Sequence, residues 1–228
     1  MAIKAMIFDL DDTLYDESQY VSQAFENTAG YLTGRLGRPE GKEEFYRRML
    51  ELVEWHGRGR VFDLLCEEAG ISVPIGELVE AYRSTVPSLR LYADAEQILK
   101  FLKENRVKTG LITDGCGRVQ HKKVTALGLD GRLNSVIVTD DFGICKPQTA
   151  CYEKCLEALE CGPLEAAYVG DNPRKDFMGA RKLGMKTFRI IRDKGMYMKE
   201  QAGPDREADY NIRFLTELER WLVRAEKS

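Results

Sequence analysis

Residues 3–13 read Ile-Lys-Ala-Met-Ile-Phe-Asp-Leu-Asp-Asp-Thr, a largely apolar run that ends in a group of carboxylates. An apolar run of this length, bounded by polar residues, is typical of a strand buried on both faces of a parallel sheet. Four later runs have the same character, at residues 109–113, 135–138, 166–170 and 186–191. Helical patterns separate most of these runs, and strands that alternate with helices predict an α/β fold with a parallel sheet.

The helices expected between these strands show apolar residues at helical spacing. They are predicted over residues 95–102, 119–127, 150–159 and 177–183, with a final helix over 214–225. One start is well marked, because Asn172 can cap a helix and Pro173 suits the first helical position. Gly184 suits the end of the same helix.

Residues 15–90 break the alternation, because they contain no clear strand and a structureless loop of this length would be unusual. Apolar residues instead recur at helical spacing in four segments, at residues 21–36, 45–53, 61–69 and 78–82. We therefore expect residues 1–14 and 91–228 to form a Rossmann-like α/β core. Residues 15–90 are expected to form an inserted helical bundle, a cap domain.

Composition excludes several classes of function. The chain has 228 residues, 31% of them charged, with a net charge of -3, so it carries no basic footprint for nucleic acid and no polybasic membrane patch. Asp9 interrupts the apolar N-terminal run, which is too short for a signal peptide, and no run approaches the ~18 apolar residues of a membrane span. We therefore expect a cytoplasmic protein, and in that reducing compartment the six cysteines, none in a CxxC pair, are expected to be free thiols. Its oligomeric state stays open.

Functional side chains follow four of the predicted strands. In open α/β sheets, ligands bind beyond the carboxyl ends of the strands, so these groups are expected at one edge. They are, in chain order, Asp9, Asp11, Asp12 and Thr13 after the first run, Thr113 and Asp114 at the second, Lys146 after the third, and Asp171 and Asp176 after the fourth. The combination is more specific than any of its parts, because each strand delivers a different functional group.

These motifs resemble those of the haloacid dehalogenase-like (HAD) hydrolase superfamily, in its phosphatase branch. IFDLDDT at residues 7–13 looks like the first motif, LITDG at 111–115 like the second, Lys146 like the third and VGDNPRKD at 169–176 like the fourth. The helical insert resembles the family's type 1 cap, placed between the first and second motifs. One departure is visible, because the second motif often has Asn where this chain has Asp114, and an extra negative charge beside a phosphate needs compensation.

The resemblance implies a magnesium-dependent phosphatase that hydrolyses a small phosphorylated metabolite through an aspartyl-phosphate. By position, Asp9 is the nucleophile and Asp11 the general acid and base. A carboxylate at about 4 Å from a phosphate dianion meets roughly 8 kcal/mol of repulsion at an effective dielectric of about 20. The site must therefore supply positive charge.

Two sources of positive charge are expected. Mg²⁺ would be held by the carboxylates of Asp9 and Asp171 and by the backbone carbonyl of Asp11, since it prefers hard oxygen ligands. Lys146 would neutralise the nucleophile and the phosphoryl oxygens. The remaining phosphoryl oxygens are expected to bind Thr113 through its hydroxyl and the backbone amides near Asp114.

Two further residues are expected to support this site. Asp176 is predicted to hold a water of the metal or to orient Lys146, and Thr13 to hold its loop by hydrogen bonding. Asp12 is predicted to be a structural cap rather than a catalyst.

Two other functions stay open. A phosphomutase of the same superfamily also keeps both Asp9 and Asp11, and a phospho-acceptor or binding module could be phosphorylated without turnover. The insert is expected to select the substrate. Its segment Trp-His-Gly-Arg-Gly-Arg at residues 55–60 predicts a turn between two helices, whose cationic groups could meet an anionic substrate or form a solvated loop.

Overall fold

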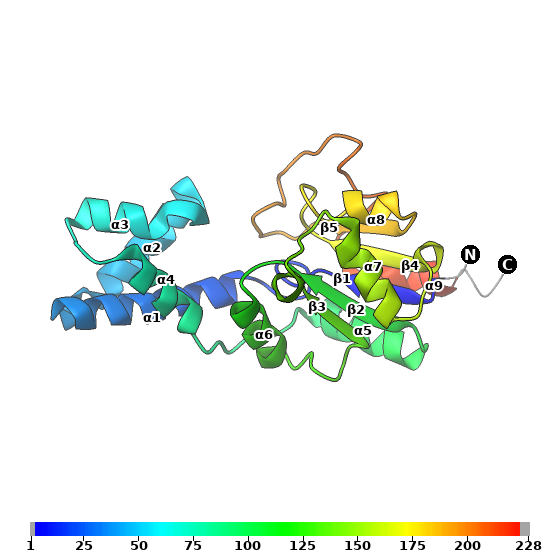
Figure 1. Ribbon diagram of the computed structural model, residues 1–228, viewed down its shortest axis with the longest axis horizontal. Coiled ribbons are helices and arrows are strands. Elements are labelled where there is room, and N and C mark those ends of the chain that lie inside the picture. The colour runs from blue at the N-terminus through cyan, green and yellow to red at the C-terminus, as the bar shows by residue number, and fades with distance from the viewer. Residues whose placement is uncertain (1–2, 224–228) are drawn as a thin grey trace. The chain divides into compact units, whose positions relative to one another are not determined.

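The computed structural model describes residues 3–223, which form two compact units (Figure 1). One is an α/β core made of the described residues up to Glu17 and from Leu89 onward, and the other is the helical insert Ser18–Ser88. None of the helices within residues 3–223 is long and apolar enough to cross a bilayer. All six cysteines, which lie within this range, are free thiols.

The core contains a parallel sheet that has six strands within the described residues, in the order β3-β2-β1-β4-β5-β6. The strands are β1 (Ala5–Phe8), β2 (Lys108–Thr113), β3 (Ser135–Val138), β4 (Ala166–Gly170), β5 (Lys186–Ile190) and β6 (Tyr210–Ile212). The predicted α/β fold and its five strands are confirmed. β6 was not predicted, because of its three residues only Ile212 is buried and the segment lacks an apolar run.

The register of β1 places the ends of three strands next to one another. Phe8, the last residue of β1, lies opposite Leu111 of β2 and Val169 of β4. The backbone N–H of Asp9 continues the ladder by donating to the carbonyl of Val169 at 2.8 Å. The residues that follow β1 and β4, and those that end β2, therefore share one edge of the sheet.

Helices cover both faces of this sheet (Figure 1). They are α5 (Ala93–Glu104), α6 (Gly117–Ala126), α7 (Thr149–Ala158), α8 (Met178–Lys182) and α9 (Glu219–Val223). Tyr152 and Cys155 of α7 and Ala180 of α8 belong to one core cluster with Ile7 and Ile112 of the sheet. Because parallel crossovers are right-handed and the strand order reverses at β1, α5 and α6 cover the opposite face.

Two helix boundaries differ from the prediction. Asn172 does cap a turn, since its Oδ1 accepts from the N–H of Arg174 at 3.0 Å, but regular helix begins only at Met178. The turn is held instead by Asp176, whose Oδ2 accepts from the N–H of Asn172 at 2.8 Å. The predicted C-terminal helix is a 3₁₀ turn, Leu215–Leu218, followed by α9, and residues 224–225 of that prediction lie outside the described residues.

The insert is an all-helical unit with its own core, and its four predicted helical segments are confirmed. The helices are α1 (Ser18–Leu36), α2 (Lys42–His56), α3 (Val61–Ala69) and α4 (Ile75–Ser84). Phe25, Phe62 and Tyr82 meet in its centre with ring centroids 5.6–6.1 Å apart. Gly57, at φ 71°, ends α2, and the 3₁₀ turn Arg58–Arg60 follows, as the glycines of this segment predict.

The chain leaves the core for the insert and returns to it along neighbouring segments. Tyr15 pairs with Leu91 in an isolated antiparallel bridge. The N–H of Tyr92 donates to the carbonyl of Leu14 at 2.9 Å. Both segments belong to the core, so hydrogen bonds of the core fix where the insert begins and ends.

Candidate active site

Three buried carboxylates lie together at the carboxyl edge of the sheet. Asp9 follows β1, Asp171 follows β4 and Asp176 lies in the next turn, and one oxygen of each lies within 4.8 Å of the others. The close approach requires glycine at position 170, because a Cβ there would overlap the carboxylate of Asp176. The end of β4 therefore brings two acids from one short segment against a third from β1.

Lys146 is the cation at the centre of this cluster, and its side chain has no exposed surface. Its ammonium donates to Oδ1 of Asp9 at 2.6 Å, to Oδ1 of Asp176 at 2.7 Å and to the hydroxyl of Tyr168 at 3.0 Å. An ammonium has three N–H bonds, so every donor of Lys146 has an acceptor within the core. Burial opposes its charge, but Asp176 and Asp9 raise its pKa well above the ordinary value.

One lysine does not balance three buried acids. Burial raises the pKa of Asp9 to about 7 against the opposing charge of Lys146, and Asp176 raises it further. Burial and then the charges of Asp176 and Asp9 raise the pKa of Asp171 well above its usual range. The Oδ2 atom of Asp171 is buried and has no hydrogen-bond partner among the described residues. A surplus of buried negative charge with an unpaired carboxylate oxygen fits a hard divalent cation.

Asp176 differs from its two neighbours because both of its oxygens are engaged. Oδ1 accepts from Lys146 and Oδ2 from the backbone of Asn172. Of the two roles predicted for Asp176, this geometry favours orientation of Lys146. Asp9 and Asp171 are then the carboxylates available to a cation.

Asp11 lies in the same site, but its carboxylate is held by a separate network. Its Oδ1 accepts from the hydroxyl of Tyr15 at 2.5 Å and from Lys123 at 2.7 Å, and its Oδ2 accepts from Gln120 at 3.0 Å. Lys123 is itself buried and also contacts Glu17 at 3.4 Å. Burial opposes the charge of Asp11, but Lys123 and then Tyr15 and Gln120 outweigh it and lower its pKa.

Gln120 joins this network to the end of β2. Its amide nitrogen also lies 2.6 Å from the hydroxyl oxygen of Thr113 and 2.8 Å from the carbonyl of Asp114, so its two N–H bonds are shared among these two oxygens and Asp11. Because the Thr113 oxygen accepts from Gln120, the hydroxyl proton of Thr113 is available to another acceptor. One side chain of α6 thus links Asp11, Thr113 and Asp114.

The carboxylate of Asp114 is also fully engaged. Oδ1 accepts from the Thr139 hydroxyl at 2.8 Å and from the backbone N–H of Lys146 at 3.2 Å, and Oδ2 accepts from the ammonium of Lys175 at 3.0 Å. Burial opposes the charge of Asp114, but Lys146 and Lys175 lower its pKa. Part of the compensation that this extra acid requires comes from Lys175, a lysine that was not among the predicted site residues.

The loop that follows β1 contains Asp12 and Thr13, for which structural roles are predicted. Asp12, at φ 54°, accepts from the backbone N–H of Glu17 at 3.0 Å and of Met196 at 3.2 Å, which agrees with a structural cap. Thr13 is predicted to hold its loop by hydrogen bonding, and its buried hydroxyl has no partner among the described residues. The loop is held through the backbone, where the Thr13 carbonyl accepts from Arg192 at 2.7 Å.

Sequence reasoning missed Lys123, Gln120 and Lys175, although each leaves a signal. Gln120 and Lys123 are polar residues at buried positions of α6, beside Val119 and Val124. A buried lysine needs an acidic partner, so its place on an inward face points to a charge inside. Lys175 lies between Asp171 and Asp176, within the motif that was already recognised.

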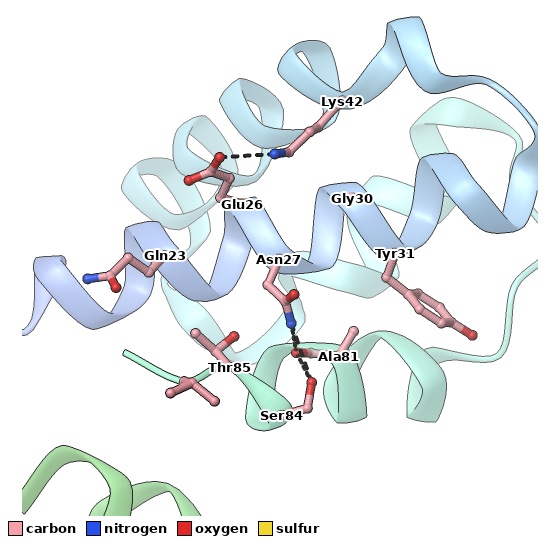
Figure 2. A pocket seen from close by; sticks show the side chains of 10 residues that line it. Gln23, Glu26, Asn27, Gly30, Tyr31, Lys42, Ala81, Ser84 and Thr85 are labelled. Carbon is pink, nitrogen blue, oxygen red and sulfur yellow. Dashed lines mark hydrogen bonds and ion pairs between the residues drawn. The ribbon is translucent and has the colours of Figure 1, made fainter. Parts of the chain in front are cut away.

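A cavity of about 620 Å³ in the insert is a weaker candidate (Figure 2). It is lined by Gln23, Glu26, Asn27, Gly30, Tyr31, Lys42, Ala81, Ser84, Thr85 and Val86. Glu26 and Lys42 pair with each other at 2.9 Å, and the Asn27 amide donates to the carbonyl of Ala81 at 2.6 Å. These polar groups are satisfied within the insert, so the chemistry is assigned to the edge of the sheet.

Comparison with known proteins agrees with the motifs. The family described as haloacid dehalogenase-like hydrolase matches residues 6–190 of this chain. A glyceraldehyde 3-phosphate phosphatase of Methanopyrus kandleri is 34% identical over 92% of this chain and 93% of its own. A phosphoserine phosphatase of Thermus thermophilus is 30% identical over 94% of this chain and 99% of its own.

A solved structure of a related protein has the same fold as this chain. A crystal structure of a HAD phosphatase from Thermococcus onnurineus superposes with a TM-score of 0.65 at 28% identity, covering 96% of this chain and 98% of its own.

Proposed function

Because the chain belongs to the haloacid dehalogenase-like hydrolase family, we propose that it is a magnesium-dependent phosphatase acting on a small phosphate monoester. The observation that carries the proposal is the buried group of Asp9, Asp171 and Lys146 at the ends of β1, β4 and β3. This group combines a nucleophile, a place for a cation and a fixed positive charge. The named phosphatases among its relatives support the same reaction class.

Asp9 is the proposed nucleophile. One of its oxygens attacks phosphorus, the bond from phosphorus to the ester oxygen breaks, and the phosphoryl group becomes an aspartyl-phosphate. Water then attacks that phosphorus, releasing inorganic phosphate and restoring the carboxylate. Lys146 holds Oδ1 of Asp9 at 2.6 Å, which orients the carboxylate and offsets its charge.

Magnesium would be held by the carboxylates of Asp9 and Asp171 and by the backbone carbonyl of Asp11. When bound, the ion supplies Lewis-acid polarisation of a phosphoryl oxygen and neutralises charge that builds up during transfer. Asp176 is assigned to the orientation of Lys146, because its two oxygens are already engaged.

Asp11 is the proposed general acid and base. Its lowered pKa suits the role of base: it takes a proton from the attacking water in the second half-reaction, and it gives that proton to the departing alkoxide in the first half-reaction of the next turnover. Thr113 binds a phosphoryl oxygen through the hydroxyl proton that its contact with Gln120 leaves available.

The insert is the proposed cap and selects the substrate, with residues 15–90 as its sequence-based bounds. The substrates named for the relatives, glyceraldehyde 3-phosphate and phosphoserine, indicate a small phosphorylated metabolite. Six free thiols are typical of proteins from a reducing compartment, which supports a place in the cytoplasm.

The test is release of inorganic phosphate from p-nitrophenyl phosphate and from a panel of metabolites that includes these two. We expect many turnovers per chain with Mg²⁺, none above background in chelator, and none for Asp9→Asn at unchanged circular dichroism. A single phosphate per chain would indicate a phospho-acceptor module instead. Isomerisation of a sugar phosphate without net release would indicate a phosphomutase.

A further inference from the structure

Asp114 places a negative charge directly after Thr113, the residue proposed to bind the phosphoryl group. Its side chain is only 13% exposed, so solvent screens it poorly. Oδ1 is held by Thr139 and by the backbone of Lys146, whereas Oδ2 accepts from the ammonium of Lys175. Without Lys175, the field of Lys146 would be left to offset the Asp114 carboxylate, and Oδ2 would face an incoming phosphate without its ammonium partner.

Lys146 cannot supply a direct hydrogen bond to the phosphate without losing one that it already makes. Its three donors are used by Asp9, Asp176 and Tyr168, and its side chain has no exposed surface. With these contacts kept, Lys146 would act on the substrate through its electrostatic field and through Asp9. An ammonium with unused donors can contact the phosphoryl oxygens without such a loss.

Lys175 has an ammonium of this kind. Its ammonium makes one hydrogen bond within residues 3–223, to Asp114, so two N–H donors are available to a ligand. Its side chain is 32% exposed, which makes it accessible in a way that Lys146 is not. Its backbone is fixed, because its N–H donates to the carbonyl of Asn172 at 3.2 Å and its own carbonyl accepts from Tyr152 at 3.2 Å.

Lys175 also interacts electrostatically with Asp9, the proposed nucleophile. The carboxylates of Asp9 and Asp176, together with Asp114, raise the pKa of Lys175 against the opposing effects of burial and Lys146. The lysine therefore stays charged within electrostatic range of Asp9. Its place in the turn between Asp171 and Asp176 ties it to the metal side of the site.

We propose that Lys175 binds the phosphoryl oxygens of the substrate directly, and that Asp114 is the positioning residue that holds its ammonium at the edge of the site. The inference rests on the proposed phosphatase function. The pair brings no net charge, so Asp114 does not repel the phosphate while Lys175 is present. Removal of Lys175 alone should therefore weaken phosphate binding more than removal of both charges does.

The experiment measures KM and kcat for p-nitrophenyl phosphate, and calorimetric binding of inorganic phosphate with Mg²⁺, for Lys175→Met. We expect both KM and the dissociation constant of phosphate to rise by about tenfold to a hundredfold, as for loss of a charge-assisted hydrogen bond. The matched control is Arg174→Met in the same turn. Arg174 is 65% exposed and pairs with Glu200 at 2.5 Å, so this variant should bind phosphate like the wild type.

Two more variants separate binding from a structural role. Lys175→Arg should keep most of the phosphate affinity, and adding Asp114→Asn to Lys175→Met should restore part of it. An affinity of Lys175→Met within twofold of the wild type, or a double variant weaker than the single one, overturns the proposal. Calorimetry measures phosphate binding without turnover. If the wild type binds phosphate through Lys175 but releases no phosphate from any ester, only the phosphatase function is contradicted. Absence of phosphate binding by the wild type overturns the role of Lys175.

Discussion

The residues of this site differ in which of their polar atoms already have hydrogen-bond partners in the protein. Lys146 and Asp176 have every donor or acceptor oxygen engaged by the core, whereas Asp171 keeps a buried oxygen without a partner. A buried, unpaired carboxylate costs free energy in the folded protein. Binding of the proposed cation to this oxygen would offset the cost.

The first prediction concerns Asp171→Asn. The pKa of Asp171 is raised in the folded state, so its carboxylate destabilises the metal-free protein at any pH above the ordinary value of 3.8. The amide carries no charge, so unfolding of the metal-free variant in urea at neutral pH should cost on the order of 1 kcal/mol more than that of the wild type. Saturating Mg²⁺ should stabilise the wild type by about 2–4 kcal/mol and the variant by much less. A metal-free variant less stable than the wild type would contradict this account.

The second prediction concerns Lys123→Met. The methionine keeps the length of the buried stem but removes the ammonium that holds Oδ1 of Asp11 at 2.7 Å. We expect kcat to fall at least about tenfold, because general acid–base groups contribute roughly 10²–10⁴ to rate, while KM changes little. Lys182→Met is the control, since this exposed lysine of α8 makes no ion pair among the described residues. Equal kcat values for both variants would show that Lys123 does not act through Asp11.

At the scale of elements, a glycine decides how closely α8 can pack against its neighbours. Gly179 lies in the first turn of α8, and a Cβ there would overlap the backbone oxygen of Pro147 and the ring of Tyr152. The segment after Lys146 and the helix after Asp176 can therefore pack closely only because position 179 lacks a side chain.

The third prediction is that Gly179→Ala destabilises the core by about 1–3 kcal/mol, because a backbone atom cannot yield as a flexible side chain can. Gly34→Ala in α1 meets no atom within 4 Å and should be neutral or stabilising by up to about 1 kcal/mol. Urea unfolding followed by circular dichroism measures both. A stable Gly179→Ala protein with normal KM would show that α8 can shift without cost.

Strands are predictable from the sequence where every residue is buried, because such a strand is an unbroken apolar run. β1 and β4 are buried at every residue, so their apolar runs are unbroken, whereas β6 has two exposed residues and could not be recognised. The acids at the strand ends were predictable because parallel topology gathers them at one edge. The contacts of Lys123 and Lys175 were not, because each joins residues far apart in the chain, by 112 positions for Lys123–Asp11 and 61 for Lys175–Asp114.

At the scale of the whole molecule, the chain consists of a unit that holds the acid cluster and a unit with a core of its own. The carboxylates and cations of the site lie outside Ser18–Ser88. The insert is instead stabilised by its own apolar cluster, which includes Phe25, Leu32 and Met49.

The fourth prediction follows from this division. Mg²⁺ added to chelator-treated protein should slow amide hydrogen exchange in peptides that cover residues 9–13 and 171–176. Exchange within residues 18–88 should stay the same, because none of the proposed ligands lies there. Hydrogen exchange with mass spectrometry measures this, with Asp171→Asn as the control that should lose the response. Protection centred on the insert would place the ion elsewhere.

The bridge between Tyr15 and Leu91, with the hydrogen bond from Tyr92 to Leu14, joins the two ends of the inserted segment at one point of the core. Because the two ends of the inserted segment meet there, we expect that an insert of another length could be grafted at this junction without changing the register of β1 and β2.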